Sequence, residues 1–333
     1  MEANIAALSK YQINNFFSEN APMTSQECDQ HAQLLIGISV HASPVQGGTS
    51  YTVVSDDNTC VIQFRADSYA LDMDFLQCVE QTYSGFTARH EYVGKLGKLH
   101  VYRMNNVGGA AMYLAREQLT ANNCFLLLQT VSDYAKFFAS AWNRTPLWMT
   151  CPDRDSLYTE YYSELRQLRQ GLHARFHSTL DYLISMLPNI LDKNWPMVPN
   201  HIDLLENNIH VDTLTGHITG ICDWKDAVIS PFGMSLGGLE TMLGFATFSR
   251  GWRYHTNQQE LRDLFWETFY QEIGGASEEQ KKLIEVAVLV GLFLGHGFER
   301  KDEIAKVPAS EGHHELRYLE AVTLTRWEQT GKR

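Results

Sequence analysis

The sequence lacks the features that would place it among secreted or membrane-spanning proteins. Its six cysteines are scattered over 333 residues and form no CxxC pair, which predicts reduced thiols of a cytoplasmic protein and no disulfide framework. The longest apolar run, residues 286–294, is too short to cross a membrane and predicts a buried helix. Residues 1–17 lack the basic region and apolar block of a signal peptide.

Positive charge is also scarce. The chain has 27 Lys and Arg residues against 39 Asp and Glu residues, a net charge of -12 at pH 7. This balance argues against nucleic acid or an anionic membrane as the main partner, and it is compatible with a cationic small molecule. Repeats, low-complexity tracts and long linkers are absent as well. A chain of this length suits two lobes with a large core, and its oligomeric state is left open.

Residues 201–224 contain the side chains that phosphoryl transfer needs. Asn208 follows five residues after Asp203, and Asp223 follows twenty residues after it. In phosphoryl transfer a carboxylate receives the proton of the attacking hydroxyl, while an amide oxygen and a second carboxylate hold Mg²⁺. Taken singly, such residues are more often turn-formers and caps than ligands. Their joint order and spacing favour an active site.

A hairpin is expected between Asn208 and Asp223. Two short stretches rich in β-branched residues, 208–212 and 217–222, are separated by a turn that ends in glycine. The resulting register places Asn208 diagonal to Asp223, at about 7–8 Å between backbones. Two oxygen ligands at that distance can share one small cation, whereas a slip of one residue would separate them.

Several short runs in and after this segment match one family. They are His201-Ile202-Asp203-Leu204, Asn208-Ile209-His210-Val211, Gly216-His217-Ile218-Thr219-Gly220-Ile221, Asp223-Trp224 and Pro231-Phe232-Gly233. These runs resemble the catalytic core of the aminoglycoside phosphotransferase and choline-kinase-like enzymes, in particular a fungal branch. The resemblance implies that Asp203 is the catalytic base and that His201 orients its loop. It also implies that Asn208 and Asp223 are the Mg²⁺ ligands and that Asn208 belongs to the catalytic residues.

The sequence departs from the family pattern near this core. Ile202 stands where the family usually has glycine, so the loop is expected to adopt a backbone conformation that needs no glycine. The segment after Pro231 lacks the family's usual Asp, and Glu240 is the nearest carboxylate. Either Glu240 takes over a structural anchoring role or that contact is lost.

A glycine-bearing bend at residues 46–50 precedes the first predicted strand. Gly47 and Gly48 are followed by Ser50, just before the strand expected at residues 51–54. A glycine pair before a strand is ordinary turn chemistry. The resemblance implies a second interpretation, in which the bend and the strand after it cover the phosphates of ATP. Both interpretations stay open from the residues alone.

The next strand, residues 60–65, lacks an expected cation. Kinase-like enzymes place Lys or Arg there to hold the phosphates, and Gln63 occupies that place. Strand alternation puts Arg65 on the same face, so its guanidinium can supply the missing charge. The alternative is that Arg65 is a solvated edge charge and that nucleotide binding is weakened.

Residues 99–104 alternate like a strand and precede a glycine turn at 105–109. The resemblance implies the hinge whose backbone meets adenine, with Tyr102 and Met104 as contacts. A core strand that ends in a turn explains the same residues. Beyond this point the apolar spacing predicts helices, namely 119–142, 157–187 with a break near Gly171, 235–246, 258–273, 278–295 and 315–330.

The resemblance implies an α+β, two-lobed protein-kinase-like fold. We expect a nucleotide-binding, sheet-rich lobe over residues 1–104, and a helical lobe with the catalytic loop and metal-binding hairpin over 105–333. The expected function is ATP- and Mg²⁺-dependent phosphorylation of a hydroxyl on a small molecule. The alternative is a catalytically weak or inactive nucleotide-binding or scaffold protein, which Gln63 favours. The sequence does not identify the acceptor.

Overall fold

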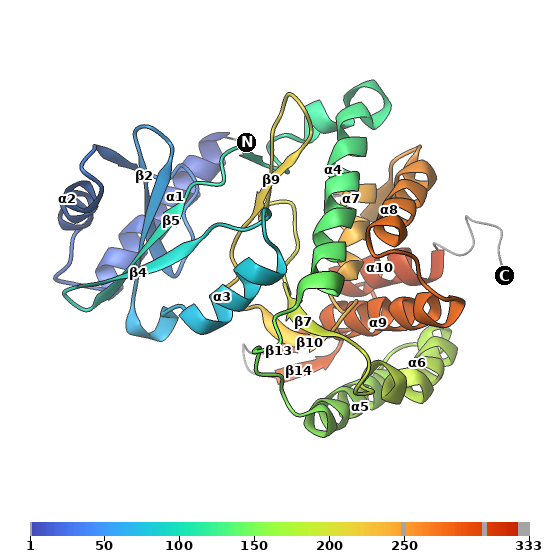
Figure 1. The fold of residues 1–333 in the computed structure, drawn as a ribbon. Coiled ribbons are helices and arrows are strands. Elements are labelled where there is room, and N and C mark those ends of the chain that lie inside the picture. The colour runs from blue at the N-terminus through green and yellow to red at the C-terminus, as the bar shows by residue number, and fades with distance from the viewer. Residues whose placement is uncertain (1, 248–250, 302–304, 326–333) are drawn as a thin grey trace. The chain divides into compact units, whose positions relative to one another are not determined.

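The computed structural model of the protein describes residues 2–247, 251–301 and 305–325. A sheet-rich N-terminal region and a helical C-terminal region confirm the predicted α+β class (Figure 1). The chain divides into two compact units. The first unit is formed by Met1–Glu80, Ser84–Gly109 and Thr219–Lys225, and the second by Gln81–Tyr83, Ala110–Ile218 and Asp226–Arg333.

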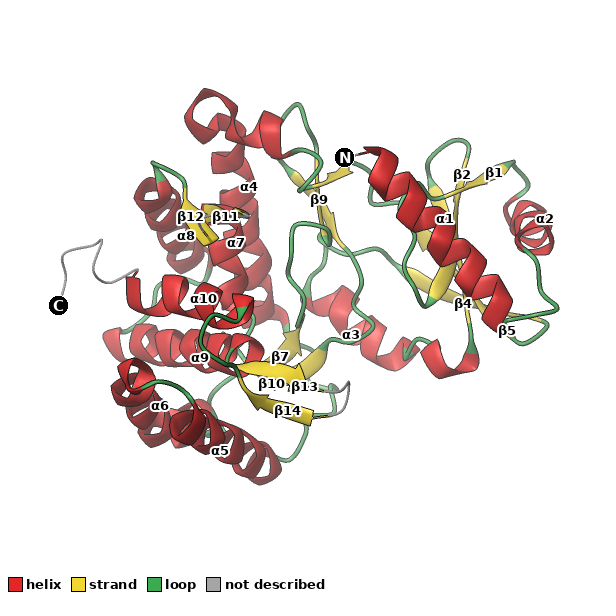
Figure 2. Cartoon of the chain, turned by 180° about the vertical axis from the view of Figure 1, so that it is seen from behind, coloured by secondary structure: helices red, strands yellow, loops and turns green. Residues whose placement is uncertain are grey.

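The first unit is built on a five-stranded antiparallel sheet of order β1-β2-β3-β5-β4. Its strands are β1 (Val40–Ala42), β2 (Ser50–Ser55), β3 (Cys60–Arg65), β4 (His90–Leu96) and β5 (Leu99–Asn105). Two helices, α1 (Glu2–Glu19) and α2 (Ser25–Ile36), pack on the sheet, and Figure 2 shows α1 lying across it. Their shared core includes Phe16, Cys28, Ala32, Tyr51, Val53, Ile62 and Phe64. A short helix, η1 (Asp67–Tyr69), and α3 (Met73–Thr82) follow β3.

Local signals explain why these elements form. Thr24 caps α2 and forms a capping box with Glu27. The turn between β2 and β3 places Asn58 at φ 57°, a left-handed conformation that asparagine tolerates. The predicted strands at 51–54, 60–65 and 99–104 are confirmed. Helix α1 and strand β4 were not predicted.

The second unit is mainly helical. Its long helices pack as α4 with α8, α5 with α6, and α6 with α9. Stacked and edge-to-face rings of Tyr134, Phe138, Phe265 and Phe269 fill the core between α4 and α8. The helices are α4 (Arg116–Arg144), α5 (Arg154–Gly171), η2 (Ala174–Phe176), α6 (His177–Ile190), η3 (Leu236–Gly238), α7 (Leu239–Leu243), α8 (Gln258–Glu272), α9 (Glu278–His296), α10 (His314–Glu320) and η4 (Ala321–Thr325).

Short antiparallel strand pairs join these helices. β7 pairs with β10, β11 with β12, β13 with β14, and β6 with β8. These strands are β6 (Ala110–Ala111), β7 (Met197–Asn200), β8 (Ile209–Val211), β10 (Val228–Pro231), β11 (Gly244–Thr247), β12 (Gly251–Tyr254), β13 (Phe298–Lys301) and β14 (Ala305–Pro308). A further strand, β9 (Ile218–Ile221), runs from the second unit into the first.

Four predicted helices need correction. Within the helix expected at 119–142, residues 121–124 are not helical, so α4 is kinked there. The helix expected at 235–246 is replaced by η3, α7 and β11. Glycine explains the strand, because a Cβ on Gly244 would lie 2.4 Å from the Arg253 carbonyl oxygen across the β11–β12 pair. The break near Gly171 is confirmed, but α6 continues past Pro188 to Ile190. Helix α10 ends at Glu320, and residues 326–330 of the last predicted helix lie outside the described residues.

Among the residues that the structure describes, no helix combines the length and the apolar character that crossing a membrane requires.

Candidate active site

The loop between β7 and β8 fixes Asp203 through its neighbours. The Asp203 backbone N–H donates to His201 Nδ1 at 3.1 Å. The Asn208 side-chain amide donates to the Asp203 carbonyl at 2.8 Å and to its carboxylate at 3.1 Å. His201 and Asn208 are 3% and 6% exposed, whereas Asp203 is exposed. Two buried side chains therefore hold one accessible carboxylate.

Asn200, the last residue of β7, anchors the base of this loop and was missed by sequence reasoning. It is buried, and its amide donates to the Ser230 hydroxyl at 2.8 Å and to the Pro231 carbonyl at 3.1 Å. Its carbonyl oxygen accepts the N–H and the hydroxyl of Ser235, at 3.2 and 2.7 Å. The segment after Pro231 lacks the family's usual Asp. Hydrogen bonds from its Ser235 nevertheless connect it to the base of the loop.

Glu240 has a structural role in this arrangement. Its carboxylate oxygens accept two hydrogen bonds from the Arg262 guanidinium, at 2.6 and 2.9 Å, and one from the Tyr254 hydroxyl at 2.8 Å. Both charged side chains are buried, and a buried charge needs such a partner. Of the two alternatives left open by the sequence, structural anchoring is the one observed.

Ile202 meets the expectation for a loop that needs no glycine. It is 63% exposed, and among the described residues it does not belong to the non-glycine positions with positive φ. A β-branched residue is therefore accommodated without strain.

The turn of the hairpin is anchored on α4. Asp133, a buried residue of α4, accepts hydrogen bonds from His217 Nδ1 at 2.7 Å and from the Ile218 N–H at 3.2 Å. Gly216 adopts φ 77°, and a Cβ there would lie 2.2 Å from the Leu126 carbonyl oxygen. Glycine is therefore required at the end of the predicted turn for two reasons, the left-handed backbone conformation and the close approach of α4.

Asp223 follows β9 in the first unit. Its φ of 63° is left-handed and its side chain is exposed; non-glycine residues in this conformation concentrate at functional sites. The buried Trp224 donates its indole N–H to the Ile221 carbonyl at 2.9 Å and fixes the turn. Burial first, and the neighbouring Asp223 charge second, raise the pKa of the Cys222 thiol to about 12, so this thiol stays protonated near neutral pH.

Gln63 and Arg65 lie on one face of β3, as predicted. The Arg65 Nε–H donates to Gln63 Oε1 at 2.6 Å, and the Gln63 amide donates to the Thr52 hydroxyl at 3.1 Å. Arg65 is only 5% exposed. The alternative of a solvated edge charge is therefore wrong, and Gln63 serves as a partner that holds the guanidinium.

The bend before β2 is organised by Gln46. Its side chain accepts the Thr52 N–H at 3.0 Å and donates to the Thr52 carbonyl at 2.7 Å. Gly47 and Gly48 are not among the glycines with positive φ, and a Cβ on Gly48 would meet only a side-chain oxygen at 3.2 Å. The bend does not depend on glycine, and the phosphate-contacting role of Gly47, Gly48 and the buried Ser50 stays a prediction.

Tyr102 and Met104 lie in β5, in the interior of the sheet. Met104 pairs with Val61 on one side and with His90 on the other. Tyr102 is buried, and its hydroxyl accepts the Leu71 N–H at 2.9 Å. The backbone of these residues is thus paired with the neighbouring strands, and their contact with adenine stays a prediction.

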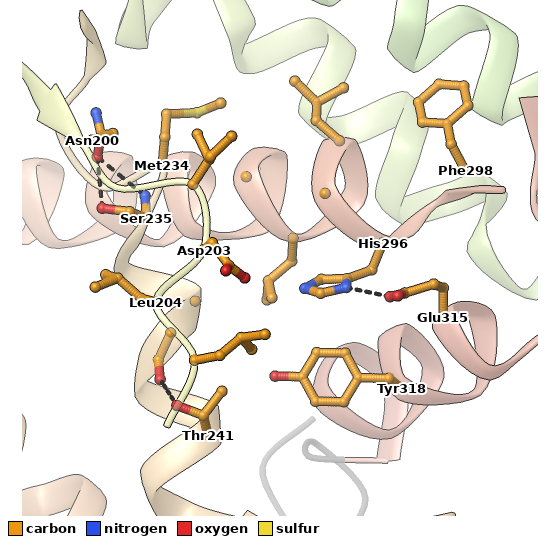
Figure 3. A pocket seen from close by; sticks show the side chains of 18 of the residues that line it. Asn200, Asp203, Leu204, Met234, Ser235, Thr241, His296, Phe298, Glu315 and Tyr318 are labelled. Carbon is orange, nitrogen blue, oxygen red and sulfur yellow. Dashed lines mark hydrogen bonds and ion pairs between the residues drawn. The ribbon is translucent and has the colours of Figure 1, made fainter. Parts of the chain in front are cut away.

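A cavity of about 1320 Å³ in the second unit reaches Asp203. Figure 3 shows Asn200, Leu204, Met234 and Ser235 on the side of Asp203, and His296, Phe298, Glu315 and Tyr318 on the other side. Its lining is contributed by α5, β7, the Asp203 loop, η3, α9 and α10. An exposed carboxylate at the wall of such a space can meet a hydroxyl of a small molecule.

The donors near Asp203 fit a hard cation. Asn208 Oδ1 accepts a hydrogen bond from the Asn207 amide at 2.9 Å, so it already acts as an acceptor. Amide and carboxylate oxygens are the donors that Mg²⁺ prefers. Within the described ranges no group of three His, Cys, Asp or Glu side chains forms a metal site, so a cation here would also take ligands from the nucleotide or from water.

The chain is similar to known proteins in sequence and in fold. Residues 107–267, which include the Asp203 loop and the hairpin, match the phosphotransferase enzyme family. A choline/ethanolamine kinase family protein from Mesorhizobium loti is 13% identical, with 82% of this chain and 84% of that chain covered and a TM-score of 0.52. An ethanolamine kinase from Plasmodium vivax is 13% identical, with coverages of 98% and 95% and a TM-score of 0.51. A putative aminoglycoside phosphotransferase from Ralstonia eutropha is 12% identical, with coverages of 86% and 89% and a TM-score of 0.51. By sequence, no curated protein matches the chain.

The family match confirms the resemblance to aminoglycoside phosphotransferase and choline-kinase-like enzymes. At these identities the structural relatives establish the fold alone, which is the predicted protein-kinase-like α+β fold. The placement in a fungal branch stays a prediction.

Proposed function

We propose that the protein is an ATP- and Mg²⁺-dependent phosphotransferase that phosphorylates a hydroxyl of a small molecule. The observation that carries the proposal is the exposed Asp203 carboxylate, which the buried His201 and Asn208 hold at the wall of a large cavity. A general base needs access to its substrate and a fixed position, and this carboxylate has both.

Each residue of the loop has a separate role in the proposed reaction. Asp203 accepts the proton of the acceptor hydroxyl as that oxygen attacks the terminal phosphorus of ATP, and ADP leaves as the bond between the two outer phosphates breaks. His201 keeps the Asp203 backbone in place. Asn208 restrains the carboxylate through its amide N–H and offers Oδ1 to Mg²⁺, for which Asp223 is the second ligand. When bound, Mg²⁺ neutralises charge on the triphosphate.

We assign the nucleotide to the N-terminal lobe of residues 1–104. Arg65, oriented by Gln63, holds phosphate oxygens there, because a guanidinium matches their geometry. The bend before β2 and the end of β5 contribute the remaining contacts, through Gly47, Gly48, Ser50, Tyr102 and Met104. The acceptor and the catalytic loop belong to residues 105–333.

The acceptor is a small molecule in a cytoplasmic setting. Choline and ethanolamine, which appear in the names of two structural relatives, serve as reference acceptors in the assay, and the acidic chain is compatible with a cation. The second candidate function is a catalytically weak or inactive nucleotide-binding protein. Gln63 in the place of the family's cation favours it, and the buried Arg65 beside Gln63 opposes it.

Thermal unfolding with ATP alone and with ATP plus Mg²⁺ tests the proposal. We expect a larger rise in Tm with the metal, and Asp223→Asn is expected to abolish the increment that Mg²⁺ adds. Asp212→Asn, in the exposed turn of the hairpin, is the matched control and keeps that increment.

Mass spectrometry of candidate acceptors then reads phosphate transfer, which Asp203→Asn is expected to lose. Absence of any nucleotide response contradicts the proposal. A nucleotide response with neither transfer nor ATP hydrolysis favours the inactive alternative.

A further inference from the structure

We propose that His296, oriented by Glu315 and accompanied by the Tyr318 hydroxyl, binds a second hydroxyl of the acceptor across the cavity from Asp203. This inference rests on the proposed function, because it assigns the acceptor to the cavity beside Asp203. It narrows the substrate class to compounds that carry at least two hydroxyls and an apolar flank.

The His296 ring is held in position by two contacts. His296 ends α9, and its Nδ1 lies 2.6 Å from a carboxylate oxygen of Glu315 in α10. Its ring packs edge-to-face on Tyr318, with centroids 4.7 Å apart, and the Tyr318 ring packs on Trp252 at 5.0 Å. A side chain fixed in this way contributes to binding at little cost in conformational entropy.

The polar ends of these side chains face the space next to Asp203. Figure 3 shows the His296 nitrogen that is not bonded to Glu315, and the Tyr318 hydroxyl, directed toward the side from which Asp203 projects. His296, Tyr318 and Asp203 all line the same cavity. Within the described part of the chain, no hydrogen bond occupies His296 Nε2 or the Tyr318 hydroxyl. Both groups are therefore available to a ligand.

The Glu315 contact selects the kind of group that His296 can bind. The His296 hydrogen bond holds the pKa of the Glu315 carboxyl below its usual range, so the carboxylate stays charged and takes the Nδ1–H. Neutral His296 then accepts at Nε2, whereas protonated His296 donates there. A hydroxyl satisfies both states, because it can donate and accept. An ammonium group satisfies only the neutral state, and a carboxylate only the protonated one.

The carboxylates of the lining argue against a cationic ligand. Of the five carboxylates that line the cavity, four are already bonded within the protein, and one of these is Asp203, which accepts the Asn208 amide. Glu164 pairs with Lys306 at 2.6 Å, Glu315 pairs with His296, and Glu299 accepts two hydrogen bonds from Ser310. The walls between the polar groups include apolar side chains, among them Leu204, Met234, Leu292, Phe298 and Trp252. Such walls pack against an apolar face of the ligand.

The test compares two probes in steady-state kinetics with ATP and Mg²⁺. 4-Nitrophenyl glucoside is uncharged, carries several hydroxyls and has an apolar ring, whereas choline is cationic and has one hydroxyl. His296→Leu is expected to lower kcat/KM for the glucoside about tenfold, mainly through KM, which is the effect of losing one hydrogen bond. The KM for ATP is expected to stay unchanged. His296→Gln, which restores a donor and an acceptor, is expected to recover most of the loss.

Tyr318→Phe is the second variant, and it removes only the hydroxyl while the packed ring remains. It is expected to raise the KM for the glucoside as well. The controls are His41→Gln, which alters an exposed histidine–carboxylate pair of the first unit, and Tyr182→Phe, which alters a partly exposed ring on α6. Both are expected to behave as wild type.

Each outcome decides the inference. Unchanged glucoside kinetics in both His296→Leu and Tyr318→Phe would overturn it. Failure to phosphorylate the glucoside also overturns it, and a Tm response to ATP plus Mg²⁺ would show that the proposed function survives this failure. If the nucleotide response is absent too, the proposed function fails, and the inference falls with it.

Discussion

The loop that carries Asp203 and the strand face that carries Arg65 hold their functional side chains in different ways. In the loop, side chains bond to the backbone, as His201 does to the Asp203 N–H and Asn208 to the Asp203 carbonyl. On the strand face, side chains bond to each other, as Arg65 does to Gln63. The sheet ladder determines the backbone there, whatever the side chains are.

This difference explains which part of the family pattern persists. A loop whose conformation depends on side-chain bonds loses its geometry when those residues change, so the pattern around Asp203 can be recognised in the sequence. A strand keeps its geometry when a side chain is replaced. The cation that the family places at Gln63 can therefore move to Arg65 on the same face.

The largest effect is expected at the loop. Asp203→Asn should lower kcat for phosphate transfer by about 10²–10⁴-fold, the usual contribution of a general base. The exposed position and the retained acceptor for the Asn208 amide should leave thermal unfolding unchanged. Steady-state kinetics and a melting curve on the same preparation measure both. A wild-type kcat in this variant would show that the Asp203 carboxylate takes no part in the reaction.

The anchoring of the loop can be tested against the strand face. Asn200→Ala leaves the partly buried N–H and hydroxyl of Ser235 and the buried Pro231 carbonyl without their partner, which is expected to cost about 2–3 kcal/mol of unfolding free energy. Thr52→Ala on the strand face removes one partly buried hydrogen bond to Gln63, and about 1 kcal/mol is expected. Urea unfolding measures both. Equal losses of unfolding free energy would show that the loop depends on its side-chain hydrogen bonds no more than the strand face does.

Sequence patterns predicted the elements whose signals are local. The apolar spacing located α8 and α9. The interactions that were missed join residues distant in the sequence. Asn200 and Ser235 are 35 residues apart, and the ion pair of Glu240 with Arg262 spans 22. No periodicity encodes such contacts, because they form only when separate elements pack.

Two further departures from prediction have the same origin. The expected helix at 235–246 gives way to a strand where β12 approaches Gly244 too closely for a side chain. Helix α1 was overlooked because its sequence alone shows no clear apolar face, and Phe16 becomes buried only against the sheet. In both cases tertiary packing overrides local preference.

Nucleotide affinity tests whether the cation has moved along the strand. Arg65→Gln is expected to weaken ATP binding about tenfold, the effect of losing a charged contact to phosphate. Gln63→Lys in that background restores a cation on the same face and should recover affinity. Titration calorimetry gives both values, and Lys95→Gln, which changes an exposed lysine of the first unit, is the control. Unchanged affinity in Arg65→Gln would show that the phosphates are held elsewhere.

The smallest effects are expected at two turn aspartates, one from each unit. The hydroxyl of Ser55, followed by the N–H and hydroxyl of Thr59, lowers the pKa of Asp57. The N–H groups of Leu214 and Thr215 lower the pKa of Asp212. A carboxyl whose folded pKa is depressed stabilises the fold above its unfolded pKa, and this contribution disappears as the pH falls through the folded value.

Asp57→Asn and Asp212→Asn should therefore melt slightly below wild type at pH 7, because asparagine keeps an acceptor but loses the charge. The difference should shrink as the pH falls below the usual range of aspartate and through the lowered folded pKa values, because the wild-type carboxyls then become protonated as well. Melting curves from pH 7 to pH 2.5 measure it. Because backbone N–H groups of the turn depend on Asp212, whereas Asp57 also bonds hydroxyls that water can replace, the larger shift is expected for Asp212→Asn. The reverse order would show that side-chain to backbone bonds stabilise the second unit no more than side-chain pairs stabilise the first.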